Sequence, residues 1–215
     1  MRSHALAAVA VAVTITVSSV AVAQSTSSAT DGANTVDPRA ERLFRLRRAN
    51  LSEDEPQGYV LLAWGVSSVA TGAVLGASGL GGERVRWYGV NTILWGAINT
   101  AIAIPWVLSF ARERRESEAG LARHGDAVVR LHDETTVRSR RQSTVFGINA
   151  LIDVAYVAGG AVAWWAGTQQ TQGSFAGDFL VGTGVAAVSQ GAFLLVFDTL
   201  GWLLAGRRTR ALEAW

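Results

Sequence analysis

Four long apolar runs constrain the fold of this chain more than any other feature of its sequence. They cover residues 58–80, 87–110, 144–166 and 179–205. A helix advances about 1.5 Å per residue, so roughly 20 apolar residues cross the hydrocarbon layer of a bilayer. Tryptophans lie near the ends of the runs, at the depth that amphipathic rings favour. The sequence therefore predicts an all-α fold, an integral membrane four-helix bundle.

Composition supports a membrane protein and narrows the chemistry that the chain can perform. Hydrophobic residues make up 49% of the chain and charged residues 17%, a balance more typical of integral membrane proteins than of soluble ones. The chain has no cysteine, which excludes disulfides, thiolate catalysis and iron–sulfur ligation. None of the common nucleotide-binding, zinc-protease or hydrolase motifs is present. We expect no enzymatic activity, no cofactor and no metal site.

The amino-terminal region contains a fifth apolar run, residues 5–23, which ends in Ala21-Val22-Ala23. That pattern favours a signal peptide, residues 1–23, cleaved after Ala23. The alternative is that the run remains as an uncleaved anchor helix. Residues 24–57 are read as a flexible linker and an arginine-rich juxtamembrane segment. Its residues 38–50 form either a short helix on the bilayer surface or a solvated charged helix, and Pro56 is expected just before the first span.

The rest of the chain divides into a membrane domain and a tail. The four-span domain covers residues 58–205 and includes a charged loop, residues 111–143. We expect this loop to continue the second helix, to break near Gly120 or Gly125, and to lead into the third span as a helix. Residues 206–215 form a basic tail. The loop lacks aromatic stacking residues, so no nucleic acid partner is expected; the expected partners are membrane lipids and a protein that contacts the loop.

The distribution of arginine leaves the topology open. Five arginines lie in residues 38–50 before the first span, eight in residues 111–143 and three in the tail, against only Arg84 and Arg86 on the opposite side. The positive-inside rule places the arginine-rich side in the cytoplasm, which requires residues 5–23 to stay as an anchor. Arg2 before that run, with Asp31 and Asp37 after it, favours an ordinary signal peptide instead. We favour cleavage, and both alternatives predict a multi-pass protein of the bacterial cytoplasmic (inner) membrane.

Polar residues inside the spans form the candidate site. They lie in stripes on the second, third and fourth spans: Asn91, Asn99, Asn149, Asp153, Gln190 and Asp198. Such groups are costly in hydrocarbon, so they face protein or a cavity. Asp153 and Asp198 lie at a similar depth from the arginine-rich side, roughly 10–14 Å by helical rise. We expect them to meet beside Asn149 and to titrate as one unit.

Two functions are compatible with this polar cluster. In the first, the chain is a non-enzymatic structural or interaction bundle, whose Asn and Asp side chains join helices by hydrogen bonds of about 1 kcal/mol or less. Its arginine-rich loops then meet lipid headgroups or a protein partner. In the second, it is a small proton- or cation-coupled transporter or channel subunit that uses Asp153 and Asp198. A water-filled cavity that reaches both carboxyls would favour the second function.

Three motifs of the spans resemble a known family. They are Asn91-x3-Trp95-x3-Asn99, Phe146-Gly147-x-Asn149-x3-Asp153-x2-Tyr156 and Gln190-Gly191-x-Phe193-x3-Phe197-Asp198. Together, over about residues 58–205, they resemble a family of small uncharacterised bacterial membrane proteins with a signal peptide and four spans. The resemblance implies a cleaved signal peptide and supplies no activity. Relatives often carry a histidine just before the asparagine of the second span, where this chain has Trp87-Tyr88-Gly89-Val90.

Overall fold

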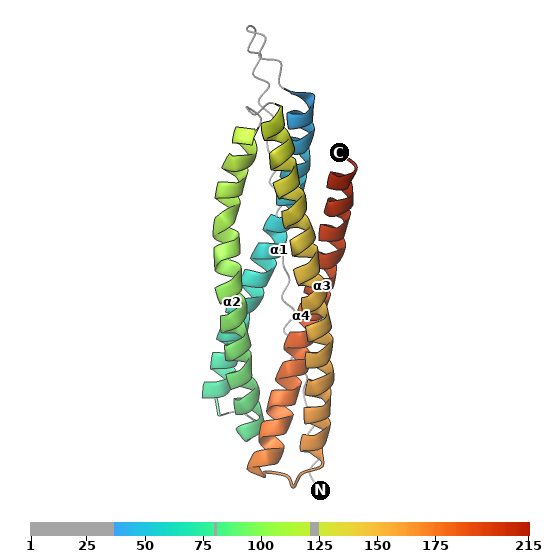
Figure 1. Cartoon of the computed structure of the whole chain (residues 1–215). Coiled ribbons are helices and arrows are strands. Elements are labelled where there is room, and N and C mark those ends of the chain that lie inside the picture. Colours follow the sequence, from blue (N-terminus) through green and yellow to red (C-terminus); the bar gives the residue numbers. More distant parts are fainter. Residues whose placement is uncertain (1–36, 80, 121–124) are drawn as a thin grey trace. The chain divides into compact units, whose positions relative to one another are not determined.

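Four long helices make up the part of the chain that the computed structural model describes, residues 37–79, 81–120 and 125–215 (Figure 1). They are α1 (Pro38–Ala77), α2 (Gly82–Ala119), α3 (Asp126–Thr168) and α4 (Phe175–Glu213). No strand occurs among these residues. The predicted all-α four-helix fold is confirmed. The predictions for residues 1–23, and for the linker up to residue 36, lie outside the described residues.

Local sequence explains where the helices begin. The Asp37 carboxylate accepts a hydrogen bond from the Arg39 amide at 2.8 Å, and Pro38 takes the first helical position. Ser174 caps α4 in the same way, since its hydroxyl accepts from the Gly177 amide at 3.2 Å. Glycine at position 81 has φ +79° and enters α2 in a backbone conformation that other residues rarely adopt.

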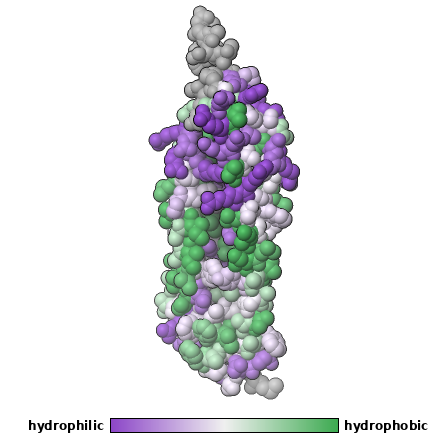
Figure 2. Space-filling model, in the orientation of Figure 1, coloured by the Kyte–Doolittle hydropathy of each residue, from purple (hydrophilic) through white to green (hydrophobic). Residues whose placement is uncertain are grey.

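The helices are about twice as long as a membrane requires. They contain 38 to 43 residues, or about 57–65 Å, against a hydrocarbon thickness of about 30 Å. Each contains a stretch that is long and apolar enough to cross a membrane. In Figure 2, hydrophilic residues gather toward one end of the helices and apolar residues cover the adjoining part. The four helices therefore extend beyond the membrane-length part as a polar bundle, at what we call the arginine-rich end.

The structure corrects the expectation for the first helix. Residues 38–50 form the first turns of α1 rather than a separate surface helix, and Pro56 lies inside α1 instead of before it. Proline removes one helical hydrogen bond, but Leu51 and Asp54 on one side of it and Gly58 and Leu61 on the other are all buried. Packing on both sides therefore keeps the helix continuous. 

The charged loop and the tail are largely helical as well. Helix α2 continues to Ala119 and α3 begins at Asp126, so the predicted break near Gly120 or Gly125 is confirmed. The basic tail extends α4 as far as Glu213. At this end a small apolar core joins α1, α3 and α4 outside the predicted spans; it contains Ala40, Leu43, Val128, Leu131 and Leu212.

Helices α1 and α2 form one hairpin, and α3 and α4 form a second. In each hairpin, glycines spaced seven residues apart bring the two helices into backbone contact, and we call this row of glycines the glycine seam. A Cβ atom on Gly72 of α1 would lie 2.6 Å from the Gly89 carbonyl of α2. In the second hairpin, a Cβ atom on Gly160 of α3 would lie 2.9 Å from the Gly184 carbonyl of α4. Such close approach is how small residues stabilise helix pairs in membranes. The two hairpins meet mainly through α2 and α4, which leaves α2 and α3 apart from each other.

Candidate functional site

A cavity of about 610 Å³ lies between α2 and α3, and we call it the groove. Helix α2 contributes Trp95, Asn99 and Trp106 to its walls. The wall on α3 follows one face of that helix: Gln142, Val145, Asn149, Ile152, Asp153 and Tyr156. Phe197 and Asp198 of α4 also line it. The groove thus combines an apolar wall with amide and carboxyl groups inside a predicted membrane-length region.

Asp153 and Asp198 meet in the groove. Their side chains are buried, with 4% and 6% of each residue exposed, and they lie close enough to interact with each other. Asn149 lies beside Asp198 on the wall of the groove. A hydrogen bond between two carboxyl groups requires that one of them carries a proton. The structure thus places together the three residues whose depth and helical spacing predicted a meeting.

The position of both aspartates follows from the glycine seam. Asp198 lies seven residues after Gly191 and fourteen after Gly184, so it continues the face of α4 that contacts α3. Asp153 lies seven residues before Gly160 on the facing side of α3. Seven residues are nearly two turns of a helix, so residues at this spacing share a face. The two carboxyls therefore lie on the faces along which α3 and α4 approach most closely.

Two polar atoms of the groove residues lack a hydrogen-bond partner among the described residues. They are the amide nitrogen Nδ2 of Asn99 and the carboxyl oxygen Oδ2 of Asp153, and both are buried. Buried polar atoms are nearly always paired with protein or water. Asn99 offers a donor and Asp153 an acceptor on the walls of the same cavity. Both residues line the groove, while the two atoms themselves are enclosed by protein.

The remaining predicted residues join helices elsewhere. Gln190 accepts a hydrogen bond from the Trp64 indole at 2.9 Å and donates to the Ser68 hydroxyl at 3.3 Å, which ties α4 to α1. Asn91 donates to the Thr183 hydroxyl at 3.1 Å, which ties α2 to α4. The six predicted residues thus separate into a group of four at the groove and two helix-to-helix contacts.

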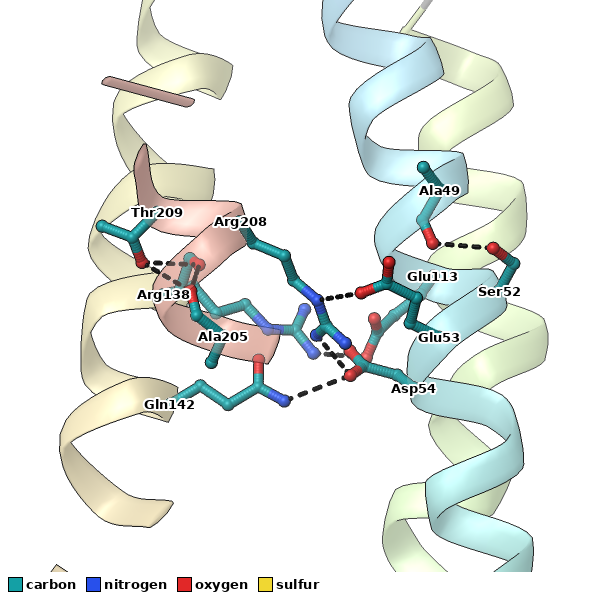
Figure 3. Close-up of polar contacts among 11 residues, drawn as sticks. Ala49, Ser52, Glu53, Asp54, Glu113, Arg138, Gln142, Ala205, Arg208 and Thr209 are labelled. Carbon is teal, nitrogen blue, oxygen red and sulfur yellow. Dashed lines mark hydrogen bonds and ion pairs between the residues drawn. The ribbon is translucent and has the colours of Figure 1, made fainter. Parts of the chain in front are cut away.

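A second polar site lies at the arginine-rich end (Figure 3). Arg208 of α4 points toward α1, where its Nε donates to Glu53 at 3.0 Å and its Nη1 forms an ion pair with Asp54. Only 5% of the Arg208 side chain is exposed. Gln142 of α3 donates to the same Asp54 carboxylate at 3.4 Å. We call these residues, together with the ion pair between Glu113 and Arg138, the charged cluster.

A cavity of about 240 Å³ adjoins the charged cluster, and we call it the polar pocket. Asp54, Glu113 and Arg208 line it, and so do Arg138 and Gln142. The last two residues also line the groove. The polar pocket and the groove therefore share two side chains of their walls.

Burial changes the acidity of Asp54. Desolvation raises the pKa of its carboxyl above the ordinary value of 3.8, and the nearby Glu113 adds to the rise. The Arg208 guanidinium and the hydrogen bonds from Arg208 and Gln142 act in the opposite direction without cancelling it. Asp54 lies before the predicted first span, so it is a carboxyl outside the membrane that holds a proton more readily than an exposed aspartate does.

Sequence reasoning did not identify the charged cluster. One signal for it exists: Leu51, Asp54, Gly58 and Leu61 follow each other at spacings of three and four residues, and all are buried. That spacing marks one face of a helix. An aspartate within such an apolar face indicates a buried charge that needs a partner. The partner itself, Arg208, is more than 150 residues away and carries no local signal.

Comparisons with known proteins identify a family but no activity. A family model described as a family of unknown function, DUF6992, matches residues 60–199. No curated protein and no solved structure matches the chain. The matched range includes every groove residue named above, whereas Asp54 and Arg208 lie outside it.

Proposed function

Because the chain belongs to DUF6992, a family of unknown function, we propose its function from the groove: it is a non-enzymatic multi-pass membrane protein that binds a proton or a small cation at Asp153 and Asp198. We place it in the bacterial cytoplasmic membrane, with the membrane lipids as its first partners. In this proposal the arginine-rich end contacts anionic lipid headgroups or a protein partner, since arginine pairs well with phosphate groups.

The observation that carries this proposal is the access of the groove to both carboxyls. A purely structural aspartate pair is expected to be enclosed by packed side chains, as Gln190 is between Trp64 and Ser68. Asp153 and Asp198 instead line a cavity of about 610 Å³. Ionisable groups inside a membrane commonly mark the path or the site of an ion or proton.

The chemistry of the residues favours a proton or a small hard cation. Two carboxyls and the amide of Asn149 present oxygen atoms, which are the donors that such cations prefer. No group of three or more His, Cys, Asp or Glu residues suited to a metal ion occurs within residues 37–79, 81–120 and 125–215. The amide contacts of Asn91 and Gln190 hold the helices together, so binding and helix association are assigned to different residues.

The test is to replace both aspartates and to observe protonated carboxyl groups directly. We expect the wild-type protein in lipid nanodiscs to show an infrared carbonyl band of a protonated carboxyl that changes with pH. The double variant Asp153→Asn, Asp198→Asn should keep its helical circular dichroism and lose this band. A parallel sodium titration of the band distinguishes a cation site from a site for protons alone.

Asp178→Asn is the matched control, because Asp178 is also buried but pairs with Arg84 at 2.5 Å near the start of α4. It should leave the pH-dependent band in place. If the double variant keeps the band, the aspartates are not the binding site. If the double variant loses its helical structure at all pH values, the pair serves the fold instead.

A further inference from the structure

We propose that the Asp153–Asp198 pair is loaded with protons from the arginine-rich end only, along a polar route in which Asp54 and Gln142 connect the polar pocket with the groove. This inference rests on the proposed function of the pair and adds the side from which protons arrive and the residues that carry them.

The first step of the route is the boundary between the two cavities. Gln142 lines both the polar pocket and the groove. Its amide donates to Asp54 at 3.4 Å, a length at which a hydrogen bond is weak and readily exchanged for one to water. Rotation of this one side chain therefore connects the polar pocket with the groove without moving a helix.

The second step runs along one face of α3. Gln142 and Asn149 are seven residues apart, and Asp153 follows four residues later, which corresponds to rises of about 10 Å and 6 Å. All three residues line the groove. Asn149 lies beside Asp198, so a water chain between Gln142 and Asn149 completes a polar path to the pair.

The polar pocket suits the uptake of protons. Four carboxylates line it, from Asp54, Glu113, Glu116 and Glu134, alongside three guanidinium groups. The groups that face Asp54 are Arg208 of α4, Gln142 of α3 and Glu113 of α2, with Glu53 next to it on α1. The raised pKa of Asp54 described above brings its proton exchange closer to neutral pH than that of an exposed aspartate, as a relay group requires.

At the other end of the groove, aromatic rings of α2 and α3 meet. The rings of Trp95 and Tyr156, which line the groove farthest from Gln142 along their helices, contact edge to face with centroids 4.7 Å apart. One turn beyond, a Cβ atom on Gly160 would lie 2.8 Å from that of Ala187. The Gly160 contact excludes water between α3 and α4, and we infer that the ring contact between α2 and α3 ends the route at the aspartate pair.

The chain offers a direct test of sidedness because it contains no cysteine. Asn149→Cys in oriented proteoliposomes is treated with a charged, membrane-impermeant methanethiosulfonate added to one side at a time. This reagent attacks the thiolate, which forms in water and not in lipid. Glu118→Cys marks the arginine-rich end and Gln170→Cys the opposite end. Asn91→Cys, on α2 and away from the groove, is the matched control.

We expect Asn149→Cys to react from the side that labels Glu118→Cys, and Gln142→Trp in the same background to abolish most of this reaction. Asn91→Cys should not react from that side. Labelling of Asn149→Cys from the Gln170→Cys side, from both sides or from neither overturns the one-sided route.

The proton-carrying role of Asp54 is tested by kinetics. After a pH jump on the arginine-rich side, Asp54→Asn should slow protonation of the carboxyl band by about tenfold or more, with the final amplitude unchanged. Gln142→Trp should slow it too, and it leaves both the Asp54 carboxyl and the Arg208 guanidinium in the chain. Glu55→Gln, which alters an adjacent carboxyl that pairs with Arg114, should keep the wild-type rate.

If both Asp54→Asn and Gln142→Trp keep the wild-type rate while the band still titrates, the route is wrong and the proposed function stands. If no band titrates in the wild type, the proposed function itself fails.

Discussion

Asp54 on α1 and Arg208 on α4 form a buried ion pair that joins the first and last helices of the bundle. Besides the Gln190 contacts and the small apolar core described above, α1 and α4 approach each other at few places, because each packs mainly against its own hairpin partner and the hairpins meet through α2 and α4. Arg208 also reaches Glu53, so one guanidinium holds two carboxylates of α1. The pair therefore fastens one hairpin to the other at the arginine-rich end.

Removing one partner of this pair should destabilise the protein strongly. We expect Arg208→Met to lower the free energy of unfolding by about 3–5 kcal/mol, because it leaves the Asp54 charge buried without compensation. Unfolding in mixed micelles, followed by circular dichroism, measures the change. Arg140→Gln is the control: Arg140 pairs with Glu213 on the surface, so it should cost less than about 1 kcal/mol. Equal losses of unfolding free energy in both variants would show that the Arg208 pair stabilises the protein no more than a surface ion pair does.

The raised pKa of Asp54 makes a prediction about stability against pH. The folded state binds this proton more tightly than the unfolded state, so the contribution of Asp54 to stability is largest below its ordinary pKa of 3.8 and declines as pH rises through the folded-state pKa. Asp54→Asn should remove that decline and leave a flatter profile of unfolding free energy against pH. A variant profile as steep as that of the wild type would contradict the assignment. Glu55→Gln serves as the control on the same helix.

The glycine seam allows a matched pair of substitutions within one helix. A Cβ atom on Gly65 would lie 2.8 Å from the Thr100 backbone nitrogen, whereas one on Gly76 would meet nothing within 4 Å. Gly65→Ala should therefore push α1 and α2 apart and cost about 1–3 kcal/mol. Gly76→Ala should be neutral or stabilise the helix by up to about 1 kcal/mol. Thermal unfolding of both variants in the same detergent measures these effects. Similar shifts of the unfolding temperature in both variants would rule out close helix contact at Gly65.

The regularity of helices explains what the sequence could predict. Four apolar runs imply four helices, and a constant rise per residue gives depth, which is how Asp153 and Asp198 were expected to meet. Gln190 lies eight residues before Asp198, or about 80° away around α4. That angle turns it toward Trp64 of α1 instead of toward α3. A stripe read from one helix does not reveal which neighbouring helix faces each part of it.

Contacts between distant residues account for what the sequence did not predict. The continuity of α1 through Pro56 depends on burial of Leu51 and Asp54 against other helices. The charged cluster depends on Arg208, which reads in the sequence as one of several arginines in a basic tail. Charge alone does not distinguish a buried arginine from a solvated one, because burial is decided by the partner that the fold supplies.

Opening the closed end of the groove should convert one-sided access into access from both sides. Trp95→Ala removes the ring that contacts Tyr156 edge to face and leaves a space for water beyond the aspartate pair. In this background, Asn149→Cys should react with the impermeant reagent from the Gln170→Cys side as well as from the arginine-rich side. Tyr156→Phe keeps the ring contact and should preserve one-sided labelling. If Trp95→Ala leaves labelling one-sided, the aromatic pair is not the barrier. Packing around Gly160 and Gly184 then forms it, and Gly160→Ala is the variant that should disturb that packing.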